Sequence, residues 1–105
     1  NAYLFEDPIT ALSNGGLTNL LLAFGSVDAY SFTFDGQIGA LDYAFATQGL
    51  ADQVVDVDEW HINADEPPLR DYNLEFGRDP GLFDPDAPFR TSDHDPLIIG
   101  LDLDP

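Results

Sequence analysis

Residues 92–101, Ser-Asp-His-Asp-Pro-Leu-Ile-Ile-Gly-Leu, decide the fold of this chain. An apolar run that follows turn-forming residues predicts a buried strand, which we expect to extend from His94 to Leu103. Its alternate side chains from Leu97 onward would face the core and leave the others to solvent. Because side chains at the mouth of a buried strand can reach a ligand, Asp93 and His94 are the first candidates for chemistry.

A hairpin is predicted upstream of this strand. Residues 30–35 alternate between apolar and polar side chains, which is the period of a half-buried strand, and residues 35–39, Asp-Gly-Gln-Ile-Gly, predict the turn. The partner strand is expected from Ala40 to Thr47, with Asp42 among small residues on one face. A third strand is expected from Val54 to His61, with its register left open.

Short helices are predicted around these strands. Asp7-Pro8 is typical of an N-cap followed by proline at the first helical position, and Asn14-Gly15-Gly16 would end that helix. A second helix is expected from Thr18 to Phe24, where Gly25 would end it. A short turn or helix is expected near residues 48–53.

Residues 62–91 show no period, and five prolines forbid a regular element there. A connection so far above the usual limit of ~15 residues is either functional or disordered. The three cations of the chain, Arg70, Arg78 and Arg90, all lie in it. For Arg90, a phosphate contact and a structural ion pair both remain open.

The composition bounds the function. The 105 residues allow one domain, and 20 acidic against 3 basic side chains, with no lysine, give a formal charge of −17. This balance argues against direct electrostatic capture of DNA, so either divalent cations screen the site or the surface is adapted to salt. The absence of cysteine excludes disulfides and thiolate metal sites. No apolar run approaches the ~20 residues that cross a bilayer, so we expect no membrane partner.

Six short segments resemble the last part of the endonuclease/exonuclease/phosphatase superfamily, and its bacterial extracellular nucleases in particular. They are residues 1–3 (Asn-Ala-Tyr), 6–9 (Glu-Asp-Pro-Ile), 41–43 (Leu-Asp-Tyr), 60–67 (Trp-His-Ile-Asn-Ala-Asp-Glu-Pro), 71–73 (Asp-Tyr-Asn) and 92–96 (Ser-Asp-His-Asp-Pro). The resemblance implies an α/β fold, the C-terminal part of a deoxyribonuclease-like two-sheet sandwich flanked by helices. Since complete members are more than twice as long, residues 1–105 are expected to be a C-terminal portion of a catalytic domain.

The resemblance also implies an activity: metal-dependent hydrolysis of phosphodiesters in DNA or RNA, with Mg²⁺, Mn²⁺ or Ca²⁺ as cofactor, in an extracellular or periplasmic protein. His94 would contact the scissile phosphate or act as general base, and Asp93 would help to hold the metal or water. Asn1 would orient the phosphate or the attacking water. Other catalytic residues of the family, including a metal-binding Glu and a second His, would lie before Asn1, so we expect these 105 residues alone to be inactive.

Two further residues complete the candidate site. An imidazole that donates from one nitrogen and accepts at the other needs a fixed tautomer, which a carboxylate can supply. We therefore expect the Asp42 carboxylate within hydrogen-bonding distance of a His94 ring nitrogen. His61, which follows Trp60 at a strand end, either packs against its neighbours or contacts substrate.

Other functions remain open. A phosphomonoesterase or lipid phosphodiesterase would use the same fold, and a non-catalytic, calcium-stabilised module would also explain the acidic surface. Asn63, Asp65 and Glu66 could bind a hard cation, although the glycine and closing glutamate of an EF-hand loop are missing. A half-sandwich would leave sheet edges and apolar faces uncovered, so we expect self-association or another chain covering them.

Overall fold

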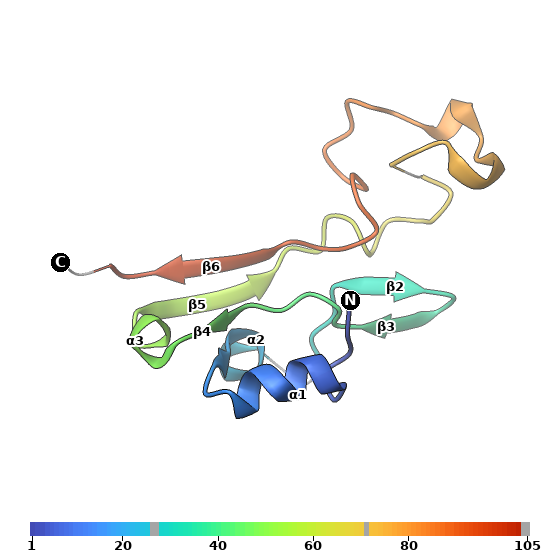
Figure 1. The fold of residues 1–105 in the computed structure, drawn as a ribbon. Helices are drawn as coiled ribbons and strands as arrows, with labels where there is room; N and C mark the ends of the chain where they lie inside the picture. The colour runs from blue at the N-terminus through green and yellow to red at the C-terminus, as the bar shows by residue number, and fades with distance from the viewer. Residues whose placement is uncertain (26–27, 71, 104–105) are drawn as a thin grey trace.

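The structure is a computed structural model that describes residues 1–25, 28–70 and 72–103. Within these ranges it is a mixed α/β chain of short helices and three two-stranded antiparallel sheets (Figure 1). The helices are α1 (Asp7–Asn14), α2 (Leu20–Phe24) and α3 (Gln48–Ala51), and 3-10 turns lie at Glu75–Gly77 and Pro80–Leu82. The strands are β1 (Thr18–Asn19), β2 (Phe32–Phe34), β3 (Gln37–Gly39), β4 (Phe45–Ala46), β5 (Val54–Glu59) and β6 (Leu97–Leu101).

The core lies between the β5–β6 ribbon and the layer that holds α2 and β4 (Figure 1). Its buried members are Leu20, Leu21, Ala46, Val54 and Val57. The β2–β3 hairpin lies at the end of the ribbon away from α3, and residues 62–70 and 72–93 project from that end as a separate lobe (Figure 1). The candidate site lies where the hairpin meets the start of β6.

The register of β5, which the sequence left open, is set by a β-bulge. A register shift falls between Val54 and Asp56, and Val54 and Val57 are both buried whereas Val55 is 61 % exposed. Residues three apart cannot share a face in a regular strand, but one extra residue in a bulge brings them to the same side. The strand also ends at Glu59, before the expected end at His61.

The predicted hairpin is confirmed, but its partner strand is wrong. The turn is Asp35-Gly36, with both φ angles positive at 48° and 76°, as a two-residue hairpin requires. β3 ends at Gly39, and residues 40–44 form no strand because the backbone N–H groups of Leu41 and Asp42 donate to the Ser31 hydroxyl. The Ser31 side chain thus takes the place of the inter-strand hydrogen bonds that the alternating pattern predicts.

The helices begin differently from the prediction. The residue that precedes α1 is Glu6, one position earlier than expected, and its carboxylate accepts from the Tyr3 backbone N–H. α2 starts at Leu20 instead of Thr18, because the Asn19 side chain caps it by accepting from two backbone N–H groups. The two residues before α2 pair with β4.

β6 is shorter than the expected strand from His94 to Leu103. Leu101 pairs with Val54, the first residue of β5, so the partner strand ends there. Leu97 and Ile99 pack on the core as expected, whereas Leu103 is 64 % exposed and Leu101 is also exposed. The burial predicted for these two leucines is therefore wrong.

The chain is more open than a compact domain of its length. Its radius of gyration is 16.2 Å, against about 13 Å for ~100 compactly folded residues. Val55 and Ile98 leave apolar side chains exposed on the β5–β6 ribbon. In the described ranges, no helix has the length and apolar character needed to pass through a bilayer.

Candidate active site

The expected contact between Asp42 and His94 is present. Asp42 Oδ2 lies 2.6 Å from His94 Nδ1, and the two residues are 52 positions apart in the chain. His94 reaches the hairpin through a single antiparallel bridge to Phe32 at the start of β2. Both side chains are partly buried, which favours a stable hydrogen bond over an exposed, water-screened one.

Ser31 holds the Asp42 carboxylate in place. The hydroxyl of this fully buried residue donates to Asp42 Oδ2 at 2.6 Å, the same oxygen that faces His94. It accepts in turn from the backbone N–H groups of Leu41 and Asp42 at 3.1 and 3.2 Å. The orientation of the carboxylate is thus fixed by backbone as well as side-chain hydrogen bonds.

The geometry fixes the tautomer of the neutral His94 ring. A proton on Nδ1 is donated to Asp42, which leaves the lone pair of Nε2 available to a ligand. The Phe32 ring packs against the imidazole, with ring centroids 5.0 Å apart. An open cavity of about 460 Å³ borders His94, and its walls include Trp60, Asn63 and Thr91.

A second imidazole–carboxylate pair lies beside the first and was not predicted. His61 Nδ1 is 2.8 Å from Asp95 Oδ2, and Asp95 is only 2 % exposed. The other oxygen of Asp95 accepts from the backbone N–H groups of Asn63 and Ala64. In the sequence Asp95 looks like an ordinary turn residue before a strand, so no local pattern indicated this second pair.

Both outcomes foreseen for His61 are compatible with its surroundings. Its ring stacks on Tyr30, with centroids 4.2 Å apart and planes 9° apart, while about a third of the side chain stays exposed. Tyr30 donates its hydroxyl proton to Asp65 at 2.8 Å, and this hydrogen bond raises the pKa of Tyr30. Asp65, one of the possible cation ligands, is thereby engaged by a phenol.

Glu59, at the end of β5, was not singled out from the sequence. Burial raises the pKa of Glu59 above its ordinary value, although nearby His61 acts in the opposite direction. One of its carboxylate oxygens is buried and makes no hydrogen bond in the described part of the chain. Burial likewise raises the pKa of Tyr43.

Arg90 mainly stabilises the lobe through hydrogen bonds to backbone carbonyls. It is 8 % exposed, its Nη1 donates to the Asn63 carbonyl at 3.0 Å, and its backbone N–H donates to the Ile62 carbonyl. No ion pair with Asp93 is found among the described residues. Arg90 also lines two cavities, so a contact with a ligand stays a prediction.

Asn1 is exposed at the chain terminus, and among the described residues no hydrogen bond joins it to Asp42 or His94. Asp93 is partly buried and borders a cavity of about 330 Å³ together with Arg78 and Arg90. Asp71, part of one family-like segment, lies outside the described residues. The structure therefore assembles Asp42, His94, Ser31, His61 and Asp95 at one place, and leaves Asn1 apart from them.

The described residues do not by themselves form a site for the implied divalent cation. Mg²⁺ and Ca²⁺ take six or more oxygen ligands, whereas Asp93 offers one carboxylate and shares its cavity with two arginines. No group of three or more histidine, cysteine or acidic side chains in ranges 1–25, 28–70 and 72–103 is arranged to hold a metal. The described residues thus offer at most part of a ligand set for this cation.

Comparison with known proteins does not assign a family. No family model matches the chain, and no curated protein or solved structure is significantly similar to it.

Proposed function

We propose that the chain is part of a metal-dependent phosphodiesterase that hydrolyses DNA or RNA, with His94 at its reacting centre. The observation that carries this proposal is the 2.6 Å contact between Asp42 and His94. A carboxylate that fixes the tautomer of an imidazole facing an open cavity is a recurring arrangement for moving protons in hydrolysis.

The proposed chemistry uses the free Nε2 of His94. In the neutral ring this nitrogen can accept a proton from an attacking water, and in the protonated ring it can donate to a phosphate oxygen. Asp42 is the positioning residue, because it touches the imidazole and not the substrate. The sequence resemblance supports both roles equally, so the proposal includes either one.

A divalent cation, Mg²⁺, Mn²⁺ or Ca²⁺, remains part of the proposal. When bound, such a cation would neutralise charge on the non-bridging phosphate oxygens. Asp93 would supply one ligand, and the rest would come from residues that the family resemblance implies upstream of Asn1. The large acidic excess of the chain makes a cation the natural bridge to a phosphate substrate.

The arrangement of these sheets within a larger domain is proposed on the same grounds. The three small sheets would be the C-terminal part of a two-sheet sandwich, completed by further chain. The open shape and the exposed apolar side chains of the β5–β6 ribbon support this. We expect the 105 residues alone to self-associate, and a compact monomer in sedimentation would contradict this. We also expect them to lack nuclease turnover, which metal-dependent DNA cleavage by a pure preparation would contradict.

The test is to restore the coding sequence upstream of Asn1 and to measure cleavage of DNA and RNA with and without a chelator. His94→Ala should lower kcat by about 10²–10⁴-fold, the usual contribution of a general acid or base. Asp58→Asn, an exposed acid on β5, is the matched control and should leave the rate unchanged. Full activity of His94→Ala would end the proposal.

The same preparation distinguishes the proposed nuclease activity from the alternative functions. A phosphomonoesterase would prefer p-nitrophenyl phosphate to its bis-ester, and a phosphodiesterase should show the reverse preference. A lipid phosphodiesterase would act on phospholipid vesicles and leave nucleic acid intact. A calcium-stabilised module would gain thermal stability from Ca²⁺ and cleave none of these substrates.

A further inference from the structure

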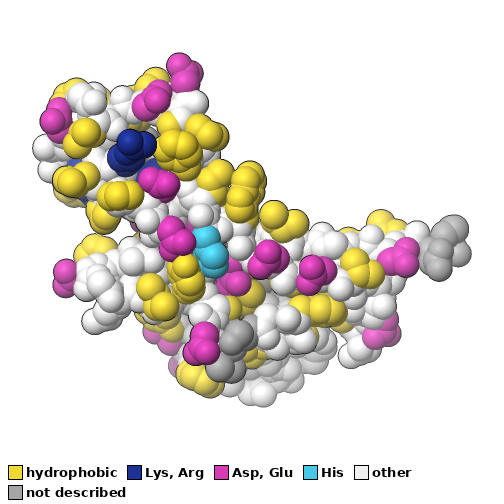
Figure 2. All heavy atoms as spheres, turned by 180° about the vertical axis from the view of Figure 1, so that it is seen from behind, with side chains coloured by type: hydrophobic (Ala, Val, Ile, Leu, Met, Phe, Trp, Pro, Cys, Tyr) yellow, Lys and Arg dark blue, Asp and Glu magenta, His cyan; other side chains and the backbone are white. Residues whose placement is uncertain are grey.

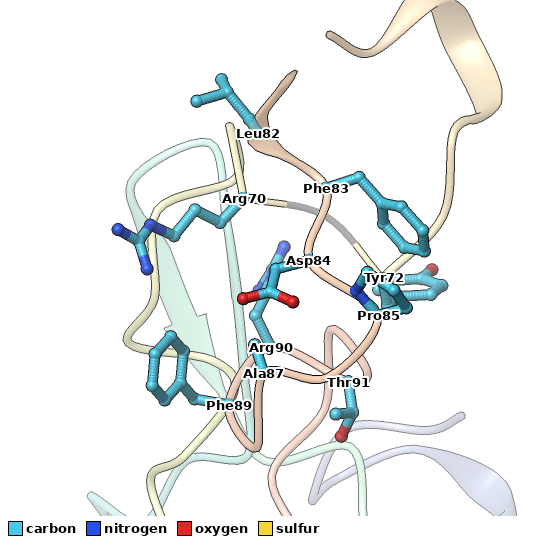
Figure 3. Close-up of a pocket in the computed structure, with 10 residues that line it drawn as sticks. All are labelled: Arg70, Tyr72, Leu82, Phe83, Asp84, Pro85, Ala87, Phe89, Arg90 and Thr91. Atoms are coloured by element: carbon cyan, nitrogen blue, oxygen red, sulfur yellow. The ribbon is translucent and has the colours of Figure 1, made fainter. Parts of the chain in front are cut away.

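A cavity in the projecting lobe has no part in the site described above. Its volume is about 230 Å³, below the ~300–1,000 Å³ of most small-molecule sites, so it would hold one ring system of a larger ligand. Figure 3 shows Arg70 and Phe89 on one side of it, Tyr72 and Phe83 on the other, and Asp84 near the middle.

Two of the three arginines in the chain line this cavity. Arg70 and Arg90 line it, whereas 20 acidic side chains are distributed over the sequence. On the face drawn in Figure 2, the basic side chains are confined to the projecting lobe and the acidic ones are spread widely. A phosphate group would therefore be repelled over most of the surface and attracted here.

The two arginines are held in different ways. Arg70 is exposed, and its guanidinium carbon lies 5.8 Å from the centre of the Phe89 ring. Arg90 is almost fully buried, and its Nε makes no hydrogen bond within the described part of the chain. One cation is thus fixed in the wall, while the other is free to close over a bound anion.

The remaining walls fit a planar ring. Three aromatic side chains border the cavity, and aromatic rings bind nucleobases by stacking, at about 1–3 kcal/mol per base. Asp84 adds carboxylate oxygens that can accept from an exocyclic amine. Rings, cations and an acceptor together match the parts of a nucleotide better than those of a free phosphate or a simple carboxylate.

The cavity adjoins the candidate active site. Thr91 lines this cavity and also the one that borders His94. Three residue steps of extended chain span at most ~11 Å, so Thr91 lies within that distance of His94. A polynucleotide with one phosphate at His94 could place a neighbouring base in this cavity.

We propose that this cavity binds one nucleotide unit of the substrate strand, next to the phosphate at His94. The inference rests on the proposed phosphodiesterase function for its physiological ligand. Binding of a mononucleotide needs no turnover, however, so the cavity can be tested independently of the reaction.

The test is titration of the ¹⁵N-labelled chain with adenosine 5′-monophosphate, with adenosine and inorganic phosphate as separate arms, at moderate salt. Amide shifts should move in residues 82–91 with the nucleotide, and the nucleotide should bind at least ten-fold more tightly than either part alone. Equal shifts with inorganic phosphate, or no shifts in this segment, would overturn the inference.

Substitutions of lining residues test whether the nucleotide binds in this cavity. Arg70→Gln and Phe89→Leu should each weaken nucleotide binding about ten-fold, as expected for one charge-assisted hydrogen bond or one stacking contact. Arg78→Gln and Phe76→Leu are matched controls, because they remove a charge and an exposed ring that do not line the cavity. Unchanged binding in the first pair, with the β5–β6 amide spectrum intact, would refute the assignment.

His94→Ala separates this inference from the proposed function. The variant should still bind the nucleotide, because His94 does not line the cavity. Nucleotide binding without any effect of His94→Ala on cleavage would leave the cavity standing and remove the proposed function. Loss of cleavage in His94→Ala, together with no nucleotide binding to the cavity, would support the proposed function and refute this inference.

Discussion

Ser31 donates its hydroxyl proton to Asp42 across 2.6 Å, and the oxygen that accepts it, Oδ2, is the same one that faces His94 Nδ1. The serine is fully buried, and its backbone carbonyl accepts from the Asp95 N–H at 2.7 Å. One residue therefore connects both imidazole–carboxylate pairs: its side chain fixes the first acid, and its backbone fixes the second.

Ser31→Ala should destabilise the fold by about 1–3 kcal/mol, because it leaves two backbone N–H groups without their acceptor and the Asp42 carboxylate without one of its donors. The measurement is urea denaturation, followed by the fluorescence of Trp60. Ser13→Ala, at an exposed position on α1, is the control and should change stability by less than ~0.5 kcal/mol. Equal stability of the two variants would mean that the Ser31 hydroxyl does not support Asp42.

Asp95→Asn should cost on the order of 3 kcal/mol, because the buried carboxylate accepts three hydrogen bonds and the amide can replace only part of them. Denaturation reports the loss, and the ring signals of His61 should shift as its partner changes. Asp58→Asn provides an exposed comparison on β5. A loss no larger than in that control would show that the His61–Asp95 pair is not structural.

Glu59→Gln should make the stability of the chain less dependent on pH. Burial raises the pKa of Glu59 in the folded chain above its ordinary 4.5, so the native state binds the proton more tightly than the unfolded state. The stability that protonated Glu59 contributes is present below pH 4.5 and is lost as the pH rises through the folded pKa. The variant should thus melt higher than the parent at pH 7, and this advantage should disappear at pH 4; an equal Tm at pH 7 would contradict the account.

Added salt should stabilise the fold. With a formal charge of −17, repulsion between carboxylates opposes compaction, and it is screened as ionic strength rises. Thermal unfolding between low and molar NaCl should show a rising Tm. A Tm that stays constant or falls would argue against a salt-adapted surface.

Local chemistry predicted much of this fold. Residues 35–39 indicated the hairpin, although its turn is only Asp35-Gly36 and residues 37–39 form β3, and the run after Pro96 indicated β6. The Asp42–His94 contact followed from the need of a working imidazole for a carboxylate partner. Its role in catalysis remains a prediction.

Other features depend on tertiary contacts that a linear pattern does not contain. The bulge in β5 set a register that the sequence had left open, and the buried hydroxyl of Ser31 turned the expected strand around Asp42 into irregular chain. The His61–Asp95 pair was missed for a similar reason. It joins residues 34 positions apart, and in the sequence Asp95 looks like an ordinary turn residue before a strand.

The central claim is that Asp42 holds the neutral imidazole of His94 with its proton on Nδ1. The ¹⁵N NMR shifts of the ring report the tautomer, and Asp42→Asn removes the negative charge at nearly constant size. We predict that Nδ1 carries the proton in the parent chain and that this preference is lost in the variant. A neutral ring protonated mainly on Nε2 in the parent, or an identical tautomer in Asp42→Asn, would contradict the account.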